Sequence, residues 1–384
     1  MSTEMRLAKR AARLSCVSVR GIVLGSILSL ACAAAHTQEI PDLPPPGLNS
    51  PPANLPHVRL ISLGGTISGT ATERLNITNY GAPRLNPQDW IDALPELALV
   101  AKVTPEDLRE PEGKASKPIS LHWMQVAKRL QELGKDDSVD GIVVTHGTNV
   151  LAETAYFMNL VVDIEKPIVF VGAQRPWTGI SGDGPLNMYN AVRVAATKAA
   201  AGKGVLQAMN QNVHAARDVT KTSAYRVDTF QAVDLGVLGV ADPDIVKFFT
   251  EPTRRHTFNS EFNVTALPAS LPPVEVLYAY SDAPDYLVDA MVARGVKGVV
   301  FDGTGAGSLT AGFAEAAKRA QEKGVVIVVT ARTFGGRVQD TPRRREANIV
   351  PGDNLPPEKA RLLLQLALTK TTDLKEITRM FAEY

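Results

Sequence analysis

The sequence predicts a two-domain α/β protein, in which a larger N-terminal domain, built on a mostly parallel sheet flanked by helices, precedes a smaller C-terminal α/β domain. Short apolar runs alternate with amphipathic helical stretches, which is the order expected of βαβ units. The run Gly141–Thr145 (GIVVT) is almost entirely apolar, as a strand buried on both faces requires. Proline, serine and asparagine become frequent between Pro243 and Pro273, where we expect the chain to pass from one domain to the next.

Each element of the N-terminal domain, residues 57–245, is predicted from a local pattern. Strands are expected where short apolar runs are bounded by polar residues, glycine or proline, at Val58–Leu63, Gly141–Thr145, Pro167–Val171 and Val205–Met209. Helices are expected where apolar residues recur at helical spacing, at Trp123–Leu133, Leu151–Val161 and Leu186–Ala200.

The C-terminal domain, residues 274–384, repeats the alternation after an inter-domain linker at residues 246–273. Its strands are predicted at Val274–Tyr280, Gly298–Phe301 and Val325–Thr330. Its helices are predicted at Tyr286–Arg294, Ala311–Lys323, Pro357–Thr369 and Asp373–Phe381. The chain shows no self-similarity at a fixed period of about 20–50 residues, which argues against a repeat protein.

The composition is that of a globular protein and excludes several function classes. The 384 residues include 41 Lys and Arg and 40 Asp and Glu. The net charge of +1 therefore gives no excess of positive charge for binding nucleic acid. Aromatic residues make up 6%, too few for a base-stacking surface. We therefore expect no nucleic-acid partner and, once an N-terminal signal is removed, no membrane partner.

Residues 1–35 differ from the rest of the chain and predict a secretory signal peptide. Five basic residues between Arg6 and Arg20 precede an apolar run that ends in three alanines at Ala35. A membrane anchor is the alternative, but the run is shorter than the roughly 20 residues that a spanning helix needs. A lipoprotein attached through Cys32 is a further alternative, although Ser29 stands where such a site favours an aliphatic residue.

Removal of the signal peptide changes what chemistry is open to the mature chain. Both cysteines, Cys16 and Cys32, are lost, so disulfides and cysteine-based metal sites or nucleophiles are excluded. The segment 36–56 is expected to be a Pro-rich linker, because proline fits neither a helix interior nor a central strand. A signal peptide also predicts a periplasmic or secreted location.

Two predicted strands end in the same dipeptide, Gly-Thr, and this repetition suggests a catalytic site. Ligands of parallel α/β sheets bind outside the carboxyl ends of the strands. One strand leads into Gly64-Gly65-Thr66 and another into His146-Gly147-Thr148. Glycine permits a sharp turn and a close approach to a ligand, and threonine offers a nucleophilic hydroxyl. The alternative is that each pair only turns the chain and caps a helix.

A threonine nucleophile needs a base, and Lys221 is the candidate. It lies in Arg217–Thr222 (RDVTKT), and a lysine acts as a base where burial or a cationic neighbour depresses its pKa. The alternative is a solvated surface lysine. The histidines are scattered without metal-ligand spacing, so we expect no metal, and for His146 a structural role is as reasonable as a catalytic one.

A glycine-rich segment, Gly303–Ser308, follows a predicted strand and suggests a phosphate-binding loop. It lacks the spacing of the dinucleotide fingerprint, and the P-loop motif that ends in Gly-Lys-Ser or Gly-Lys-Thr is absent from the sequence. Nucleotide binding is therefore only a minor hypothesis.

Residues 57–384 as a whole resemble the bacterial type II, or periplasmic, L-asparaginases and the related glutaminase-asparaginases. Five sequence blocks in the order of that family carry the resemblance, and no single block would suffice. They are Leu63–Gly69, Thr145–Asn149 with Glu153–Phe157, Lys166–Ala173 with Arg175 and Pro176, Asp183–Asn187 with Tyr189–Val192, and Arg217–Thr222. Ala216 stands where the family usually has a glycine.

The resemblance implies hydrolysis of a side-chain amide to aspartate or glutamate and ammonia, through an acyl-enzyme on threonine. By position, it assigns the nucleophile to Thr66 and an assisting tyrosine in a mobile lid, residues 68–84, to Tyr80. It assigns a pair that activates and relays protons to Thr148 and Lys221. It implies no cofactor, and a homotetramer in which a neighbouring subunit completes each site.

The resemblance also assigns substrate-binding residues, among which the chain departs from the family. The predicted residues are Gly65, Ser116, Lys117, Gly147, Asn149, Ser308 and Asp340. Asn149 stands where the family has an aspartate that holds the α-ammonium group of the substrate. Ser116 matches the serine that binds the α-carboxylate, and Lys117 replaces an uncharged or acidic residue. Asp340 is the acid nearest to the position that the family supplies from the neighbouring subunit.

The sequence therefore favours an exported amidohydrolase that acts on L-asparagine, with L-glutamine as a further substrate. The alternative is a periplasmic amino-acid-binding protein or a catalytically weakened relative with an altered substrate, which Asn149 and Lys117 favour. Ammonia release distinguishes the two, because a binding protein takes up the amino acid without turnover.

Overall fold

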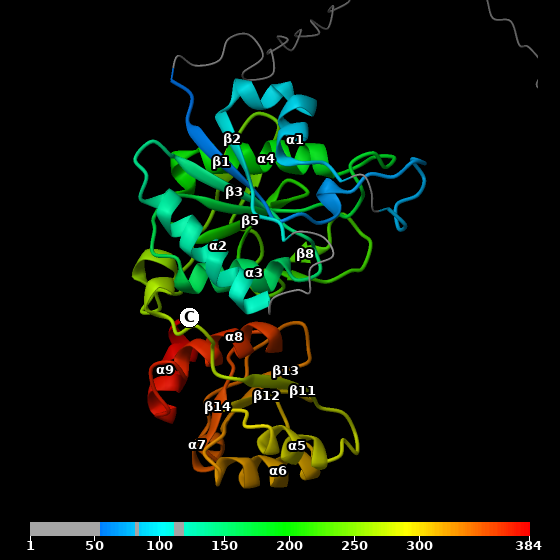
Figure 1. Ribbon diagram of the computed structural model, residues 1–384. Helices are drawn as coiled ribbons and strands as arrows, with labels where there is room; N and C mark the ends of the chain where they lie inside the picture. Colours follow the sequence, from blue (N-terminus) through cyan, green and yellow to red (C-terminus); the bar gives the residue numbers. More distant parts are fainter. Residues whose placement is uncertain (1–53, 81–83, 111–118) are drawn as a thin grey trace, which may run out of the picture. The chain divides into compact units, whose positions relative to one another are not determined.

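The computed structural model describes residues 54–80, 84–110 and 119–384, whose strands form two main sheets (Figure 1). The strands of the larger sheet, in spatial order, are β10 (Val246–Phe248), β9 (Gly239–Ala241), β6 (Asn212–Ala215), β5 (Val205–Met209), β4 (Ile168–Val171), β3 (Gly141–Thr145), β1 (His57–Ser62) and β2 (Lys102–Asp107). Those of the smaller sheet are β11 (Val274–Tyr278), β12 (Gly298–Gly303), β13 (Val326–Ala331) and β14 (Ile349–Pro351). A two-stranded ribbon pairs β7 (Thr220–Lys221) with β8 (Phe230–Gln231).

The strand directions confirm the predicted fold class. In the larger sheet β2, β1, β3, β4 and β5 run parallel, whereas β6, β9 and β10 join in antiparallel fashion. The smaller sheet is parallel throughout. Parallel strands need cover on both faces, and every residue of β3, β4 and β5 is buried.

Helices lie against both faces of the larger sheet. In chain order the α-helices are α1 (Pro87–Ala93), α2 (Ile119–Gly134), α3 (Leu151–Val161), α4 (Gly184–Ala196), α5 (Tyr286–Ala293), α6 (Ala311–Gln321), α7 (Pro342–Glu346), α8 (Pro357–Ala367) and α9 (Leu374–Glu383). α4 packs against β1, β3, β4 and β5, and α2 and α3 lie on the opposite face (Figure 1). α3 is buried along almost its whole length, because α8 from the C-terminal part packs against it.

Short 3₁₀ helices occupy several of the connections. They are η1 (Thr66–Ser68), η2 (Pro95–Leu99), η3 (Lys198–Ala200), η4 (Thr257–Asn259) and η5 (Val264–Ala266). No helix within residues 54–80, 84–110 and 119–384 is both long and apolar enough to cross a membrane. The predicted signal peptide, 1–35, lies outside the described residues.

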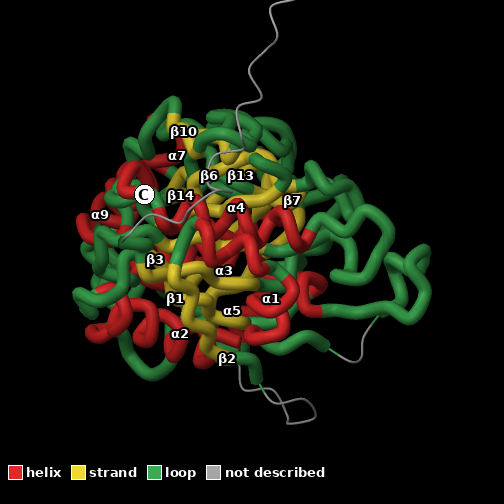
Figure 2. Tube along the Cα trace, turned by 90° about the horizontal axis from the view of Figure 1, so that it is seen from above, coloured by secondary structure: helices red, strands yellow, loops and turns green. Residues whose placement is uncertain are grey.

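The predicted lid is a loop where the structure describes it. From Gly69 to Tyr80 the chain contains neither α-helix nor extended strand, and a long loop projects from the molecule in Figure 2. It is bound to the loop that follows β4, since the Ala71 N–H donates to Thr178 Oγ1 and the Ile180 N–H donates to the Arg74 carbonyl. These few bonds hold a segment with little buried apolar surface, as suits a lid.

Three features differ from the sequence prediction for physical reasons. β2 contains Pro105 and was not expected to be a strand, but it lies at the edge of the sheet, where a missing donor is tolerated. β10 lies within the segment 246–273 that the sequence predicts as a linker, and it pairs with β9. The Gly303–Ser308 segment is a tight turn whose Thr304 and Ser308 N–H groups bond each other's carbonyls, so those donors are not offered to a phosphate.

Candidate active site

The two Gly-Thr turns meet at one edge of the larger sheet. β1 and β3 are parallel neighbours whose last residues, Ser62 and Thr145, lie opposite each other. The turn after β1 has Gly65 at a φ of 98°, a conformation that favours glycine. The backbones of the two turns touch, because a Cβ built on Gly65 would stand 2.5 Å from the Gly147 nitrogen. The threonines that follow these glycines are therefore brought together.

The hydroxyl of Thr66 forms a short hydrogen bond with the phenol of Tyr80. Thr66 Oγ1 lies 2.5 Å from the Tyr80 oxygen, and either atom can donate. Tyr80 comes from the lid, and its ring packs so closely on Gly69 that a Cβ there would stand 2.6 Å from the ring. Gly69 also pairs with Arg84 in an isolated bridge. The predicted lid therefore places a phenol against the hydroxyl of Thr66.

The hydroxyl of Thr148 is bonded to Lys221. Lys221 Nζ donates to Thr148 Oγ1 at 2.8 Å, from the two-residue strand β7. Burial lowers the pKa of the Lys221 ammonium below the usual range of lysine. The lysine is therefore easier to deprotonate than a solvated one, and its neutral form can accept a proton.

A cavity of about 220 Å³ lies between these pairs. Its lining residues are Gly65, Thr66, Gly69, Tyr80, Arg84, Gly147, Thr148 and Asn149. Of the predicted residues, the structure thus brings together Gly65, Thr66, Tyr80, Gly147, Thr148 and Asn149 around one space, with Lys221 bonded to one of them. The cavity is small and has both threonines in its wall, so it suits a small molecule.

His146 has a structural contact beside the turn. Its Nδ1 lies 2.7 Å from the carbonyl oxygen of Gly147, and the ring is buried against Phe170. Burial lowers the pKa of this imidazole, so the ring is neutral near pH 7. Among the described residues, no group of three or more His, Cys, Asp or Glu side chains is arranged to hold a metal ion.

The other predicted binding residues lie elsewhere. Ser116 and Lys117 fall outside the described residues. Ser308 belongs to the turn after β12, and Asp340 is paired with Arg345, whose Nε lies 2.9 Å from the carboxylate. Neither Ser308 nor Asp340 lines the cavity of its own chain.

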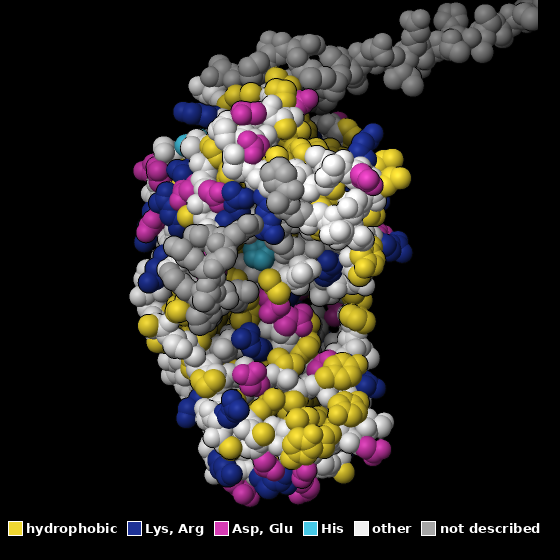
Figure 3. Space-filling view, turned by 45° about the vertical axis from the view of Figure 1, so that its right-hand side comes forward, with side chains coloured by type: hydrophobic (Ala, Val, Ile, Leu, Met, Phe, Trp, Pro, Cys, Tyr) yellow, Lys and Arg dark blue, Asp and Glu magenta, His cyan; other side chains and the backbone are white. Residues whose placement is uncertain are grey.

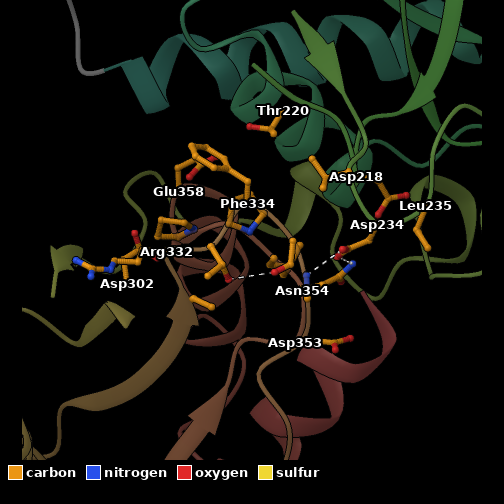
Figure 4. Close-up of a pocket in the computed structure, with 18 of the residues that line it drawn as sticks. Asp218, Thr220, Asp234, Leu235, Asp302, Arg332, Phe334, Asp353, Asn354 and Glu358 are labelled. Carbon is orange, nitrogen blue, oxygen red and sulfur yellow. Dashed lines mark hydrogen bonds between the residues drawn. The ribbon is translucent and has the colours of Figure 1, made fainter. Parts of the chain in front are cut away.

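A larger cavity, of about 260 Å³, lies at the carboxyl ends of β11, β12 and β13 (Figure 4). Figure 4 shows Asp218 and Thr220 on one side and Asp302, Arg332 and Glu358 on the other. Its lining includes neither Thr66, Tyr80 nor Thr148. The carboxylates there lack a nucleophile paired with a base, so the smaller cavity is the better catalytic candidate despite its size.

The sequence prediction did not include two residues that the structure brings to the site or near it. Arg84 lines the small cavity, and the only signal for it is its position at the end of the lid. Lys359 is completely buried and bonded to the segment before Lys221. The sequence pattern that could have identified Lys359 is its helical spacing from Leu362, Leu363 and Leu366, which places a lysine on an apolar helix face.

Comparisons with known proteins match this fold and these motifs over most of the chain. The family model described as "Asparaginase, N-terminal" matches residues 57–254, and "Glutaminase/Asparaginase C-terminal domain" matches residues 273–381. L-asparaginase 2 of Bacillus subtilis is 42% identical over 331 residues, which are 86% of this chain and 87% of the relative. Glutaminase-asparaginase of Pseudomonas fluorescens is 39% identical over 334 residues, 86% of this chain and 91% of the relative.

A solved structure gives the same result for the fold. The crystal structure named probable cytoplasmic L-asparaginase, from Campylobacter jejuni, superposes with a TM-score of 0.81 at 37% identity and covers 86% of this chain and 100% of its own. Family models that span both domains and relatives of this identity leave no other assignment. The chain belongs to the asparaginase family, of the amidohydrolase kind that includes the glutaminase-asparaginases.

Proposed function

We propose that the protein hydrolyses the side-chain amide of L-asparagine, and of L-glutamine as a further substrate, to the acid and ammonia. The observation that carries the proposal is that two threonines share one cavity and each is bonded to a proton-transfer group, Tyr80 for Thr66 and Lys221 for Thr148. The relatives named L-asparaginase and glutaminase-asparaginase support this substrate class.

In the first half of the proposed reaction, Thr66 Oγ1 forms a bond to the amide carbon. The Thr66 proton passes to the Tyr80 oxygen along the short hydrogen bond between the two residues. At the same time Tyr80 gives its own proton to the amide nitrogen. The carbon–nitrogen bond then breaks, ammonia leaves, and an ester to Thr66 remains.

In the second half, water replaces ammonia. The water oxygen bonds to the ester carbon while a proton of the water passes through the Thr148 hydroxyl to the neutral Lys221 amine. The ester bond breaks, the proton that Lys221 has taken is released so that the Thr66 oxygen becomes a hydroxyl again, and the free acid leaves. The lowered pKa of Lys221 supports this role, because only the neutral amine accepts a proton.

The proposal also assigns residues to the α-groups of the substrate. We propose that Asn149 accepts a hydrogen bond from the α-ammonium group and that Ser116 and Lys117 bind the α-carboxylate. Gly65 and Gly147 leave space for the substrate beside the threonines.

Threonine substitution tests the proposal. Thr66→Ala and Thr148→Ala should each lower kcat for L-asparagine by roughly 10³-fold or more, measured as ammonia release. Thr372→Ala is the matched control, since Thr372 is an exposed threonine between α8 and α9, does not line the cavity and should keep the wild-type rate. Wild-type rates in both active-site variants would remove the mechanism.

An amino-acid-binding role is the second candidate, favoured by the uncharged Asn149 in the cavity wall. It predicts heat of binding for L-asparagine in calorimetry without ammonia. Ammonia release by the purified chain, abolished in Thr66→Ala, rules this role out.

We further propose a homotetramer in which a neighbouring subunit completes each site. Ser308 and Asp340 then act in the cavity of the neighbour, in keeping with their absence from their own. Hydrophobic side chains gather over the C-terminal part in Figure 3, where Tyr278, Tyr280 and Tyr286 are exposed. Light scattering after size exclusion tests the proposal, and a fully active monomer would contradict it.

For location, we propose export with removal of residues 1–35. A relative from Haemophilus influenzae, 41% identical, is named a probable periplasmic L-asparaginase, whereas the Campylobacter jejuni structure is named cytoplasmic. Cell fractionation and sequencing of the mature N-terminus test the proposal. A cytoplasmic chain that still begins at Met1 would overturn it.

A further inference from the structure

Lys359 on α8 is completely buried and uses its ammonium group to hold one short stretch of backbone. Its Nζ donates to the carbonyl oxygens of Ala216 and Arg217, each at 2.8 Å, and of Val219 at 2.5 Å. An ammonium group has three N–H donors, so all of them are satisfied by this one turn. Burial of a charge without such partners is strongly unfavourable, so the three carbonyls and the lysine depend on each other.

This stretch of backbone leads directly to the candidate base. Residues 216–219 connect β6 with β7, and β7 consists of Thr220 and Lys221 alone. A two-residue strand paired with another two-residue strand, β8, fixes its own position weakly. The position of Lys221 therefore depends on how the turn before it is held.

The same lysine contacts the helix that follows the second Gly-Thr turn. Lys359 Nζ lies 5.7 Å from the ring centroid of Tyr156, on α3. α3 begins at Leu151, three residues after Thr148. One ammonium group thus touches both segments that supply the Thr148–Lys221 pair.

The contact between α8 and the 216–219 turn, which Lys359 bridges, borders a cavity on one side. The cavity in Figure 4 is lined by Asp218 and Thr220 from the N-terminal part and by Glu358 from α8. Asp218 belongs to the turn, Thr220 follows it, and Glu358 precedes Lys359. Beside this cavity, the hydrogen bonds of Lys359 link α8 to the turn.

We propose that Lys359 is a positioning residue that holds the Ala216–Val219 turn so that Lys221 meets Thr148, which ties the docking of α8 to the assembly of the active site. The inference rests on the proposed function. Lys359 does not line the catalytic cavity and touches no reacting atom, so it acts only through Lys221.

The charged groups around Lys359 are compatible with a protonated side chain. Burial lowers the pKa of its ammonium to about 8, and the nearby Glu358, Asp218 and Glu153 carboxylates oppose that shift, whereas Arg217 adds to it. At neutral pH the group is therefore mostly protonated and keeps all three donors.

The test compares Lys359→Met with a matched core variant of the same helix. Methionine keeps an unbranched apolar chain but removes every donor. We expect kcat for L-asparagine to fall roughly 10- to 100-fold, as a displaced catalytic group causes, while KM changes less than about twofold. Leu363→Ala, at a fully buried leucine one turn further along α8, should lower thermal stability without changing kcat at a temperature where it is folded.

A double variant separates positioning from general damage. If Lys359 acts through Lys221, adding Lys359→Met to Lys221→Met should leave kcat where Lys221→Met alone has put it. Losses that multiply would overturn the inference, as would a kcat for Lys359→Met equal to that of wild type.

A second substitution keeps the test open if Lys359→Met does not fold. Lys359→Arg retains charge and donors, but its planar fork cannot direct three N–H groups from one nitrogen. A lowered kcat with an unchanged KM supports the inference, and a wild-type kcat contradicts it. A wild-type protein that releases no ammonia would instead overturn the proposed function, and this inference with it.

Discussion

Gly65 lies in van der Waals contact with Gly147, so that a Cβ on Gly65 would stand 2.5 Å from both the nitrogen and the Cα of Gly147. The two turns that carry Thr66 and Thr148 are therefore spaced by backbone alone. Any side chain at Gly65 must push the turns apart, and with them the two hydroxyls.

Replacement of Gly65 by alanine should therefore damage catalysis more than stability alone explains. A displacement of about 1 Å at a catalytic group costs roughly 100-fold in rate, so we expect at least that loss in kcat/KM. Gly324→Ala is the control, because Gly324 also has a positive φ, 78°, but open space around its Cβ position. Steady-state ammonia release by both folded variants checks the difference, and equal rates would show that the contact is unimportant.

The pH dependence of the reaction should follow Lys221. Burial lowers the pKa of this amine, and the proposed mechanism uses its neutral form, so kcat should rise with pH and level off below the pH at which a solvated lysine deprotonates. Lys221→Arg should lose roughly 100-fold or more in rate, because arginine stays protonated. A pH–rate profile of both proteins is the measurement, and a rate independent of pH across the alkaline limb would contradict the role.

The phenol of Tyr80 should contribute through its hydroxyl. Tyr80→Phe keeps the ring that packs on Gly69 but removes the oxygen that is bonded to Thr66, so kcat should fall roughly 10²- to 10⁴-fold with little change in thermal stability. Single-turnover ammonia release isolates this step. An unchanged rate would mean that Thr66 loses its proton by another route.

Substitution of Asn149 by aspartate should improve recognition of the amino acid. A carboxylate in the cavity wall would strengthen the bond to the α-ammonium group by about 1–2 kcal/mol, so KM for L-asparagine should fall roughly tenfold. Succinamic acid, which has the amide but no amine, is the matched substrate and should gain nothing. An equal gain for both compounds would show that the aspartate acts on something other than the ammonium.

The elements that hold the threonines follow from local patterns, which explains why the sequence predicts them. Gly141–Thr145 and Leu151–Val161 have the same bounds in the structure as in the prediction, because a buried strand and a buried helix leave continuous apolar signals. The two Gly-Thr turns and Lys221 carry their chemistry within a few residues. The convergence of the two turns follows from parallel strands that end at one edge, whereas Lys221 comes from the separate β7–β8 ribbon.

What the sequence does not predict depends on contacts between distant segments. Lys359 is bound to carbonyls 140 to 143 residues earlier in the chain, and no local pattern in the sequence predicts such a partner. The short strands β7 to β10 are set by their neighbours in the sheet, because two or three residues carry too little periodicity. Arg84 reaches the cavity only because the lid folds back.

The outermost strands of the larger sheet also bear on how the protein behaves at high concentration. On one side the sheet stops at β2, where Pro105 withdraws a backbone donor, and on the other at β10, which has only three residues. A long, flat edge strand with a full row of unpaired N–H and C=O groups would template the addition of strands from other molecules, and neither edge here has that character. Protection against aggregation is thus built into the edges of the same sheet whose strands β1 and β3 lead to the two threonines.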